Sequence, residues 1–266
     1  MSSETTLSKD NLDTFLKELS KEFRKLNGKS TPAEIIMIGG AAILANYGFR
    51  DITTDIDAII LASSAMKEAI NRVGDKFALP NGWLNSDFMR TESYSPELSR
   101  HSKYYRTFSN VLTVRTIDAE YLVAMKLRAG RKFKHDLSDI VGVLAEHEKR
   151  GTPITLDTVK TATVNLYGSW ESISEDMRGF IEDVYQRGNF EQLYTAVAAE
   201  ESQSKKILIE LQNEYPGIMN TENVDNILAA AKRKRLSAQI YNAEQRRTEP
   251  SVTSLQKNSR DTDKGT

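Results

Sequence analysis

Two aspartates and two glycines form the densest group of residues that could do chemistry in this sequence. Asp55 and Asp57 lie two residues apart in the apolar stretch 55–61, and Gly39-Gly40 comes about fifteen residues earlier. Alternate side chains of a strand point to the same face, so both carboxylates share one face. Neighbouring carboxylates repel each other unless a cation lies between them, and their oxygens suit one or two divalent metals. Such metals bridge phosphate oxygens and activate a nucleophile.

Gly39-Gly40 separates the apolar run 34–38 from a helical segment. Glycine lets the backbone approach a ligand closely, and the N-terminus of the next helix offers free N–H groups to an anion. Each motif also has a structural explanation, as a turn or as two surface acids. In combination they favour function, because the strand is otherwise apolar and buried carboxylates are costly without a cation. A phosphate cradle beside paired carboxylates fits nucleoside triphosphate chemistry.

The composition narrows the choice of metal. The 266 residues include no Cys and three scattered His, which excludes disulfide scaffolds, zinc ribbons, thiol nucleophiles and iron–sulfur clusters. A metal must therefore be a hard cation such as Mg²⁺, held by carboxylates. The net charge is -1. The N-terminus has no apolar signal region, and no stretch reaches the roughly 18 apolar residues of a membrane span, so we expect a cytoplasmic protein.

Apolar periodicity predicts the elements that position these residues. In the first half we expect an α/β (α+β) pattern: helices over 10–27, 41–47 and 64–77, strands over 34–38 and 55–61, and weaker strands over 83–89, 104–108 and 111–116. Residues 1–9 are polar and expected to be loose. The second half predicts only helices, over 119–129, 134–149, 156–167, 175–187, 190–214 and 222–247.

The first motif resembles a known signature. Gly39-Gly40, a helix, Arg50, Thr54 and Asp55-Ile56-Asp57 resemble the pattern of the nucleotidyltransferase superfamily related to DNA polymerase β. The Arg and Thr before the acids resemble the AbiEii-type toxin nucleotidyltransferases and related bacterial proteins.

A second segment is similar to those toxins' motif of a helical Lys, a basic turn and Asp-x-x-Asp. Here Lys126 and Arg131 are followed by Asp136 and Asp139. The resemblance covers roughly 34–145. It implies a small mixed-sheet nucleotidyltransferase domain, which we place over 1–150. The helical pattern predicts an all-helical domain over 151–247, and the polar composition predicts a disordered tail over 248–266.

The resemblance implies a role for each matching residue. Gly39 and Gly40 would hold the triphosphate, and Asp55 and Asp57 would bind Mg²⁺. Arg50, Thr54 and Arg131 would assist nucleotide binding.

Lys126 would contact a phosphate or neutralise developing charge. Asp136 would orient Lys126 or activate the acceptor hydroxyl. Many members of the superfamily carry a third metal-binding acid, for which Asp87 is the candidate and Asp118 a poorer one, since a helix N-cap explains it.

Several of these residues keep a structural alternative. Lys126 could be an ordinary exposed residue of an amphipathic helix, and Asp136 could favour a helix N-terminus. The basic cluster Arg131, Lys132, Lys134 and His135 could be a solvated turn or could grip phosphates. The aromatic and basic residues at 104–106 could stack a base or pack as a strand edge. The basic runs 232–235 and 246–247 could contact nucleic acid or be a solvated helix.

The expected activity is Mg²⁺-dependent transfer of a nucleotide from an NTP to an acceptor. The resemblance makes RNA, particularly a tRNA 3′ end, the leading acceptor, and implies a growth-inhibiting toxin with a cognate antitoxin. The alternatives are transfer to a protein or small-molecule hydroxyl, and a catalytically silent nucleotide-binding module.

Overall fold

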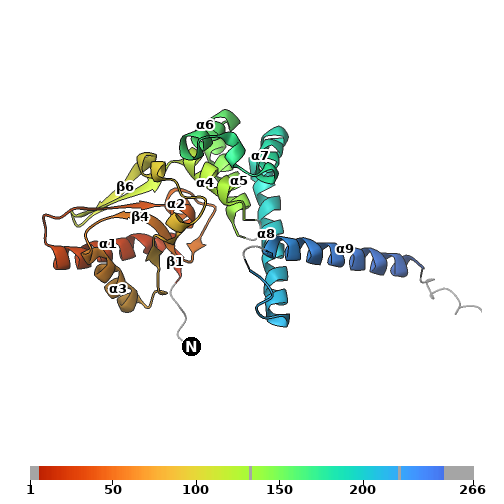
Figure 1. The fold of residues 1–266 in the computed structure, drawn as a ribbon, viewed down its shortest axis with the longest axis horizontal. Helices are drawn as coiled ribbons and strands as arrows, with labels where there is room; N and C mark the ends of the chain where they lie inside the picture. The colour runs from red at the N-terminus through yellow and green to blue at the C-terminus, as the bar shows by residue number, and fades with distance from the viewer. Residues whose placement is uncertain (1–5, 132–133, 221–222, 249–266) are drawn as a thin grey trace, which may run out of the picture. The chain divides into compact units, whose positions relative to one another are not determined.

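The computed structural model describes residues 6–131, 134–220 and 223–248. The chain divides into two compact units, 1–203 and 204–266. The first unit contains the sheet and most of the helices; helix α8 begins in the first unit and ends in the second, which also contains α9 (Figure 1).

The first unit opens with alternating strands and helices. They are β1 (Leu7–Ser8), α1 (Lys9–Asn27), β2 (Ala33–Met37), α2 (Gly39–Asn46), β3 (Ile52–Thr53), β4 (Ile56–Leu61), α3 (Ala65–Phe77), β5 (Leu84–Asn85), β6 (Ser102–Phe108) and β7 (Leu112–Ile117), with the 3₁₀-helices η1 (Asp87–Arg90) and η2 (Pro96–Arg100) between β5 and β6.

The elements that follow in the described part of the chain are all helices. They are α4 (Ala119–Ala129), α5 (Asp136–Lys149), α6 (Leu156–Tyr167), α7 (Glu175–Arg187), α8 (Phe190–Glu214) and α9 (Val224–Thr248), with the 3₁₀-helix η3 (Trp170–Ser172) before α7.

The main sheet is mixed and has the strand order β5-β4-β2-β7-β6. Strand β2 runs antiparallel to β4 and parallel to β7, β4 is parallel to β5, and β6 and β7 form an antiparallel hairpin. Strands β1 and β3 pair separately. Because β2 and β4 are antiparallel, the end of β2 meets the start of β4. Gly39-Gly40 and Asp55-Ile56-Asp57 therefore lie at one edge of the sheet.

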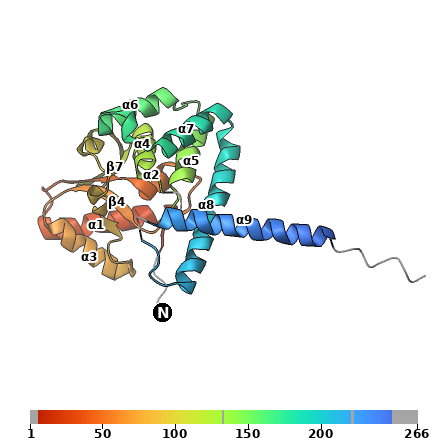
Figure 2. The ribbon, with the colours of Figure 1, turned by 45° about the vertical axis from the view of Figure 1, so that its right-hand side comes forward.

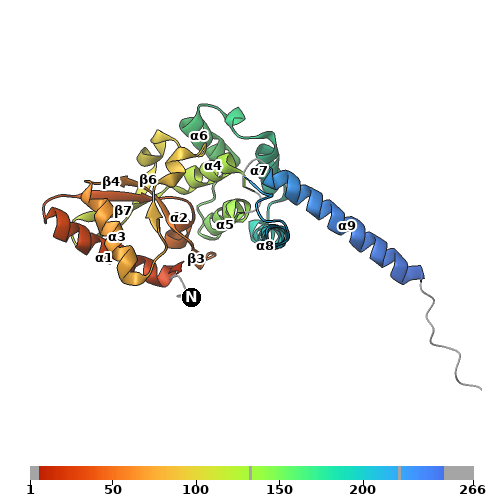
Figure 3. The ribbon, with the colours of Figure 1, turned by 60° about the horizontal axis from the view of Figure 1, so that its bottom comes forward.

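The sheet separates two hydrophobic clusters. Alternate residues of β2 face opposite sides, so Ile35 packs with the apolar faces of α1 and α3, while Ile36 packs with α2 and α4. Helices α1 and α3 accordingly lie side by side on one face of the sheet (Figures 2 and 3). Strands β2 and β4, which adjoin the glycines and carry the acids, are thus largely buried between these two clusters.

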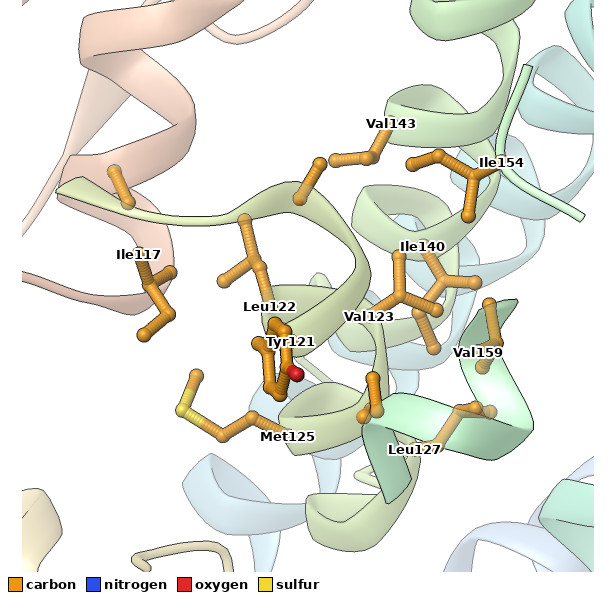
Figure 4. Packing of buried hydrophobic residues seen from close by; sticks show 14 of the residues in the cluster. Ile117, Tyr121, Leu122, Val123, Met125, Leu127, Ile140, Val143, Ile154 and Val159 are labelled. Carbon is orange, nitrogen blue, oxygen red and sulfur yellow. The ribbon is translucent and has the colours of Figure 1, made fainter. Parts of the chain in front are cut away.

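The second cluster extends from the sheet into the helices that follow it. Leu122 and Val123 of α4 are fully buried, and they pack with Ile140 of α5 and Val159 of α6 (Figure 4). Helix α7 and the first turns of α8 pack on the same cluster. Helix α4 is therefore buried along most of its length, and its residues 121–127 are held by packing.

The mixed α/β fold with a helical C-terminal region is confirmed, and most predicted elements lie within two residues of the observed ones. Two expectations were wrong in part. The segment 83–89 is a strand only at Leu84–Asn85, because Asn85 Oδ1 accepts a hydrogen bond from Asp87 N and turns the chain into η1. The segment 7–8 is a strand rather than loose, and Leu7 is fully buried.

The predicted domain boundaries stay a prediction. Helices α6 and α7 pack on α4 within the first compact unit, which ends at residue 203. The predicted tail lies almost wholly outside the described residues. Within the described ranges, no helix combines the length and the apolar character needed to cross a membrane.

Candidate functional site

The end of β2 and the start of β4 bring Gly39 and Asp57 together. Ile38 N donates a hydrogen bond to Asp57 O at 2.9 Å. Gly39 is the first residue of α2 and has a φ of +56°, a conformation that favours glycine. A Cβ placed on Gly39 would lie 3.7 Å from Asp57 Oδ2. The carboxylate therefore lies directly beside the N-terminus of α2.

Gly40 is required by close packing. A Cβ at this position would lie 2.6 Å from Thr53 Oγ1 and 3.0 Å from Arg50 Nη2. Thr53 is buried in β3, and its hydroxyl donates to Asp55 O at 3.2 Å. Because Gly40 has no side chain, β3 can approach α2 closely, and this contact fixes the segment that carries Asp55.

Polar side chains hold Asp55 in place. Thr54 Oγ1 donates to Asp55 Oδ1 at 3.1 Å, and Asn85 Nδ2 donates to Asp55 Oδ2 at 3.4 Å. Asn85 is the register partner of Asp57 in the parallel pair of β4 and β5, so the two side chains share a face. In the part of the chain that the structure describes, no side chain forms a hydrogen bond or ion pair with the Asp57 carboxylate.

The environment of the Asp57 carboxylate disfavours its charged form. Burial, and then the charge of Asp55, raise its pKa above the usual range. Arg131 and Lys134 act in the opposite direction, and Asp87 adds to the rise. Two neighbouring half-buried carboxylates offer oxygen ligands to a hard divalent cation, so Asp55 and Asp57 have the donor chemistry that Mg²⁺ prefers.

Asp87 lies on η1 with an exposed side chain, 3.9 Å from Arg90 Nη1. Among the residues the structure describes, no three acidic or histidine side chains are grouped closely enough to hold a metal. Asp87 as a third ligand therefore stays a prediction. Asp118, the poorer alternative, occupies the N-cap position of α4.

Lys126 lies at the centre of a buried ion-pair network. Its Nζ is 2.9 Å from Asp136 Oδ1 and 2.8 Å from Asp139 Oδ2, both in the first turn of α5. All three residues are buried, so the alternative of an exposed Lys126 is wrong. Burial acts to raise the pKa of Asp136, but Lys126 and Arg131 outweigh it and lower the pKa to about 2. Burial acts to lower the pKa of Lys126, and its two acidic partners outweigh that and raise it.

Two arginines extend this network to the acid pair. Arg131 Nε lies 2.7 Å from Asp136 Oδ2, and Arg50 Nη1 lies 2.6 Å from Asp139 Oδ2. Arg131 is also a cation that lowers the pKa of Asp57, while Arg50 packs on Gly40. The network thereby connects α4 and α5 with both motifs of the first segment.

Comparison with known families identifies the superfamily. The family model described as "Nucleotidyltransferase of unknown function (DUF6036)" matches residues 14–149, just over half of the 266-residue chain. The chain belongs to this nucleotidyltransferase family. No curated protein and no solved structure matches the chain. The resemblance to the superfamily is thus confirmed, whereas the closer resemblance to AbiEii-type toxins stays a prediction.

All of the site residues named so far lie within the matched segment of this nucleotidyltransferase. Two of them were not assigned roles from the sequence. Asp139 appeared only as part of a motif, although it holds both Lys126 and Arg50. Asn85 had no signal, because a strand of two residues shows no alternation that would place it beside Asp57.

The other basic and aromatic candidates lie elsewhere. Tyr104 is exposed on the edge strand β6, while Tyr105 and Arg106 both contact Asp13 of α1, which ties them to the scaffold. Lys132 lies outside the described residues.

The basic run 232–235 lies in α9 of the second unit, where Arg235 forms an ion pair with Glu210. A nucleic-acid contact there stays a prediction.

Proposed function

We propose that this nucleotidyltransferase is an active enzyme that transfers a nucleotide from an NTP to a hydroxyl acceptor, with Mg²⁺ held by Asp55 and Asp57. The observation that carries the proposal is the Asp57 carboxylate. It lies beside Gly39 at the start of α2, it has a raised pKa, and no side chain in the described part of the chain is paired with it. An acid in this state is suited to a cation and to the phosphates that accompany it.

The residues around Asp57 would each have a different role in binding the NTP. Gly39 and the first N–H groups of α2 would receive phosphate oxygens, and Arg131, half exposed, would add positive charge beside Asp57. Thr54 would keep Asp55 oriented through its hydrogen bond. When bound, Mg²⁺ would supply charge neutralisation and alignment of the phosphates.

The buried ion-pair network would act by positioning other residues, without contacting the substrate. The ammonium group of Lys126 forms ion pairs with Asp136 and Asp139. We therefore propose that Lys126 orients these two acids and does not contact a phosphate. The acids in turn orient Arg131 and Arg50. Asp136 would hold both Lys126 and Arg131. In the transfer, the acceptor oxygen forms a bond to the α-phosphorus, the bond from that phosphorus to pyrophosphate breaks, and the acceptor proton passes to solvent.

The resemblance to AbiEii-type toxins supports RNA, in particular a tRNA 3′ end, as the acceptor, and a toxin role with a cognate antitoxin. Two cations beside Asp57, Arg131 and Lys134, are consistent with a polyanionic substrate. The acceptor and the toxin role rest on the resemblance alone.

A labelling experiment tests the activity and the acceptor together. The protein is incubated with each α-phosphate-labelled NTP, Mg²⁺, total tRNA and a cell lysate. Asp57→Asn serves as the site variant, and Asp51→Asn, an exposed acid nearby, serves as its matched control. We expect label in tRNA from the wild type and Asp51→Asn, and a loss of about 10²–10³-fold in Asp57→Asn.

The other outcomes select among the alternatives. Label that appears in protein or small molecules identifies a different acceptor. NTP binding without label in any fraction identifies a silent nucleotide-binding module. Equal labelling by the wild type and Asp57→Asn contradicts the site.

A further inference from the structure

Helix α8 carries a carboxylate where its buried stripe predicts an apolar residue. Phe190, Tyr194 and Val197 follow helical spacing and pack on the core that contains α4 and α5. The next position of this stripe is Glu201, which is 4% exposed. Both Tyr194 and Glu201 lie in the first unit, beyond the segment matched by the family model.

Glu201 caps the N-terminus of α5. Its Oε1 accepts hydrogen bonds from Leu137 N at 2.9 Å and from Ser138 N at 3.3 Å. These are two of the amides at a helix start that have no partner within the helix. Its Oε2 is buried without a hydrogen-bond partner in the described residues, and His135 Nδ1 lies 4.0 Å away. Burial is the main reason that the pKa of Glu201 is raised to about 7.

The turn that Glu201 holds is the turn that anchors the ion-pair network. Asp136 and Asp139 flank the two capped amides, and they hold Lys126 between them. Asp136 also holds Arg131, the cation beside Asp57. A displacement of this turn would therefore change the position of Arg131 directly.

The same helix holds the other end of the network. Tyr194 O–H donates to Phe49 O at 2.9 Å, directly before Arg50. The Phe49 ring lies against Gly142 of α5, where a Cβ would approach it to 2.7 Å. Helix α8 thus contacts both the loop that carries Arg50 and the turn that carries Asp139.

A capping role alone does not explain a buried carboxylate at this position. An Asn or Ser placed before α5 would cap the helix locally, and an apolar residue would continue the stripe of α8 without the cost of burying a charge. Glu201 instead fixes α8 and α5 to each other at the level of Asp136.

We propose that Glu201 is a positioning residue of the nucleotidyltransferase site, supplied by the helical region outside the family segment. It fixes the first turn of α5 and thereby holds Arg131 beside Asp57. The inference rests on the proposed function for its catalytic consequence. Its structural consequence, the fixed position of Arg131, is independent of any activity.

Three variants and a control test the proposal on the full chain. Glu201→Gln keeps an acceptor oxygen at the same side-chain length, and Glu201→Leu removes it. Glu201→Asp keeps the carboxyl group, but its side chain is one methylene shorter and does not reach the amides. Glu191→Leu is the control, because Glu191 is an exposed acid of the same helix that forms an ion pair with exposed Lys149. All are measured at equal folded fraction.

The first readout is the exchange of the Arg131 Nε–H proton with water, followed by NMR without nucleotide. We expect exchange at least about 10-fold faster in Glu201→Leu and Glu201→Asp, and unchanged exchange in Glu201→Gln and the control. Unchanged exchange in Glu201→Asp overturns the proposal even if Glu201→Leu fails to fold.

The second readout is label transfer at saturating NTP. We expect a loss of about 10-fold or more in Glu201→Leu and Glu201→Asp, and rescue to within about 3-fold in Glu201→Gln. If Glu201→Gln loses as much transfer rate as Glu201→Leu, the positioning role is overturned. If the wild type transfers no label, the proposed function fails, while Arg131 exchange still decides the role of Glu201.

Discussion

Two groups of charged residues lie close together in the first unit and differ in how their charges are balanced. In the buried network, two carboxylates, Asp136 and Asp139, are matched by Lys126 and by two arginines. At the edge of the sheet, among the residues that the structure describes, only Thr54 and Asn85 donate hydrogen bonds to the Asp55 carboxylate, and no side chain donates to that of Asp57.

The pKa shifts follow this difference. The cations of the network lower the pKa of Asp136 to about 2, whereas burial and Asp55 raise the pKa of Asp57. A matched carboxylate stabilises the fold as an anion. An unmatched one is tolerated and is available to bind a cation. The comparison therefore separates residues that position the site from residues that would meet the substrate.

The largest effect is expected from removing the central cation. Lys126→Met leaves Asp136 and Asp139 buried and facing each other, so we expect the free energy of unfolding to fall by about 3–5 kcal/mol. Urea unfolding with an unchanged m-value measures it. Lys149→Met is the control, because it removes an exposed ion pair and should change stability by less than about 0.5 kcal/mol. Equal effects of the two variants would show that the network does not act as a buried unit.

The second effect is a pH dependence of the same network. The pKa of Asp136 is lowered on folding, so its contribution is complete above its ordinary pKa of 3.8 and is lost as the pH falls toward 2. We expect wild type to exceed Asp136→Asn in stability by on the order of 2 kcal/mol more at pH 5 than at pH 2. Urea unfolding across this range measures the difference. A difference that stays constant with pH would contradict the ionised, paired state of Asp136.

The network also shows where the sequence was a sufficient guide. Helical spacing predicted α4 and α5 closely, and the resemblance to the toxin motif suggested that Asp136 could orient Lys126, to which it is paired. The burial of Lys126 was not predictable, because it depends on how α6 and α7 pack over α4, which single-helix periodicity does not contain.

The third prediction concerns Gly40, where α2 packs closely on Thr53 and Arg50. Gly40→Ala would place a Cβ 2.6 Å from Thr53 Oγ1 and 3.0 Å from Arg50 Nη2, so we expect a loss of about 1–3 kcal/mol from overpacking. Arg50 pairs with Asp139 of the network, and Thr53 holds the backbone of Asp55. Gly48→Ala is the control, since nothing lies within 4 Å of a Cβ there, and should change stability by less than about 0.5 kcal/mol. Thermal unfolding compares the two. A tolerated Gly40→Ala would show that β3 and α2 are not held closely together.

The acid pair was predictable for a different reason. Asp55, Asp57 and Gly39 are local motifs, and the antiparallel pairing of β2 and β4 brings them together through short connections. Glu201 and Asn85 were missed because they reach the site from a distant helix and from a strand of two residues. For Glu201 the sequence signal was weak, a carboxylate in the apolar stripe of α8, and for Asn85 there was none.

The smallest expected change in unfolding free energy tests the central claim most directly. The claim is that the Asp57 carboxylate, which has no side-chain partner among the described residues, serves to bind a cation. The measurement is the thermal stability of Asp57→Asn and wild type, each with and without Mg²⁺, with Asp136→Asn beside them. Without metal, Asp57→Asn should be more stable than wild type by up to about 1 kcal/mol, because it removes the repulsion from Asp55. Asp136→Asn should be less stable than wild type.

Adding Mg²⁺ should raise the Tm of wild type and leave Asp57→Asn unchanged, since a ligand stabilises only the folded state that binds it. A loss of stability in metal-free Asp57→Asn, or equal Mg²⁺ responses of the two proteins, would contradict the account.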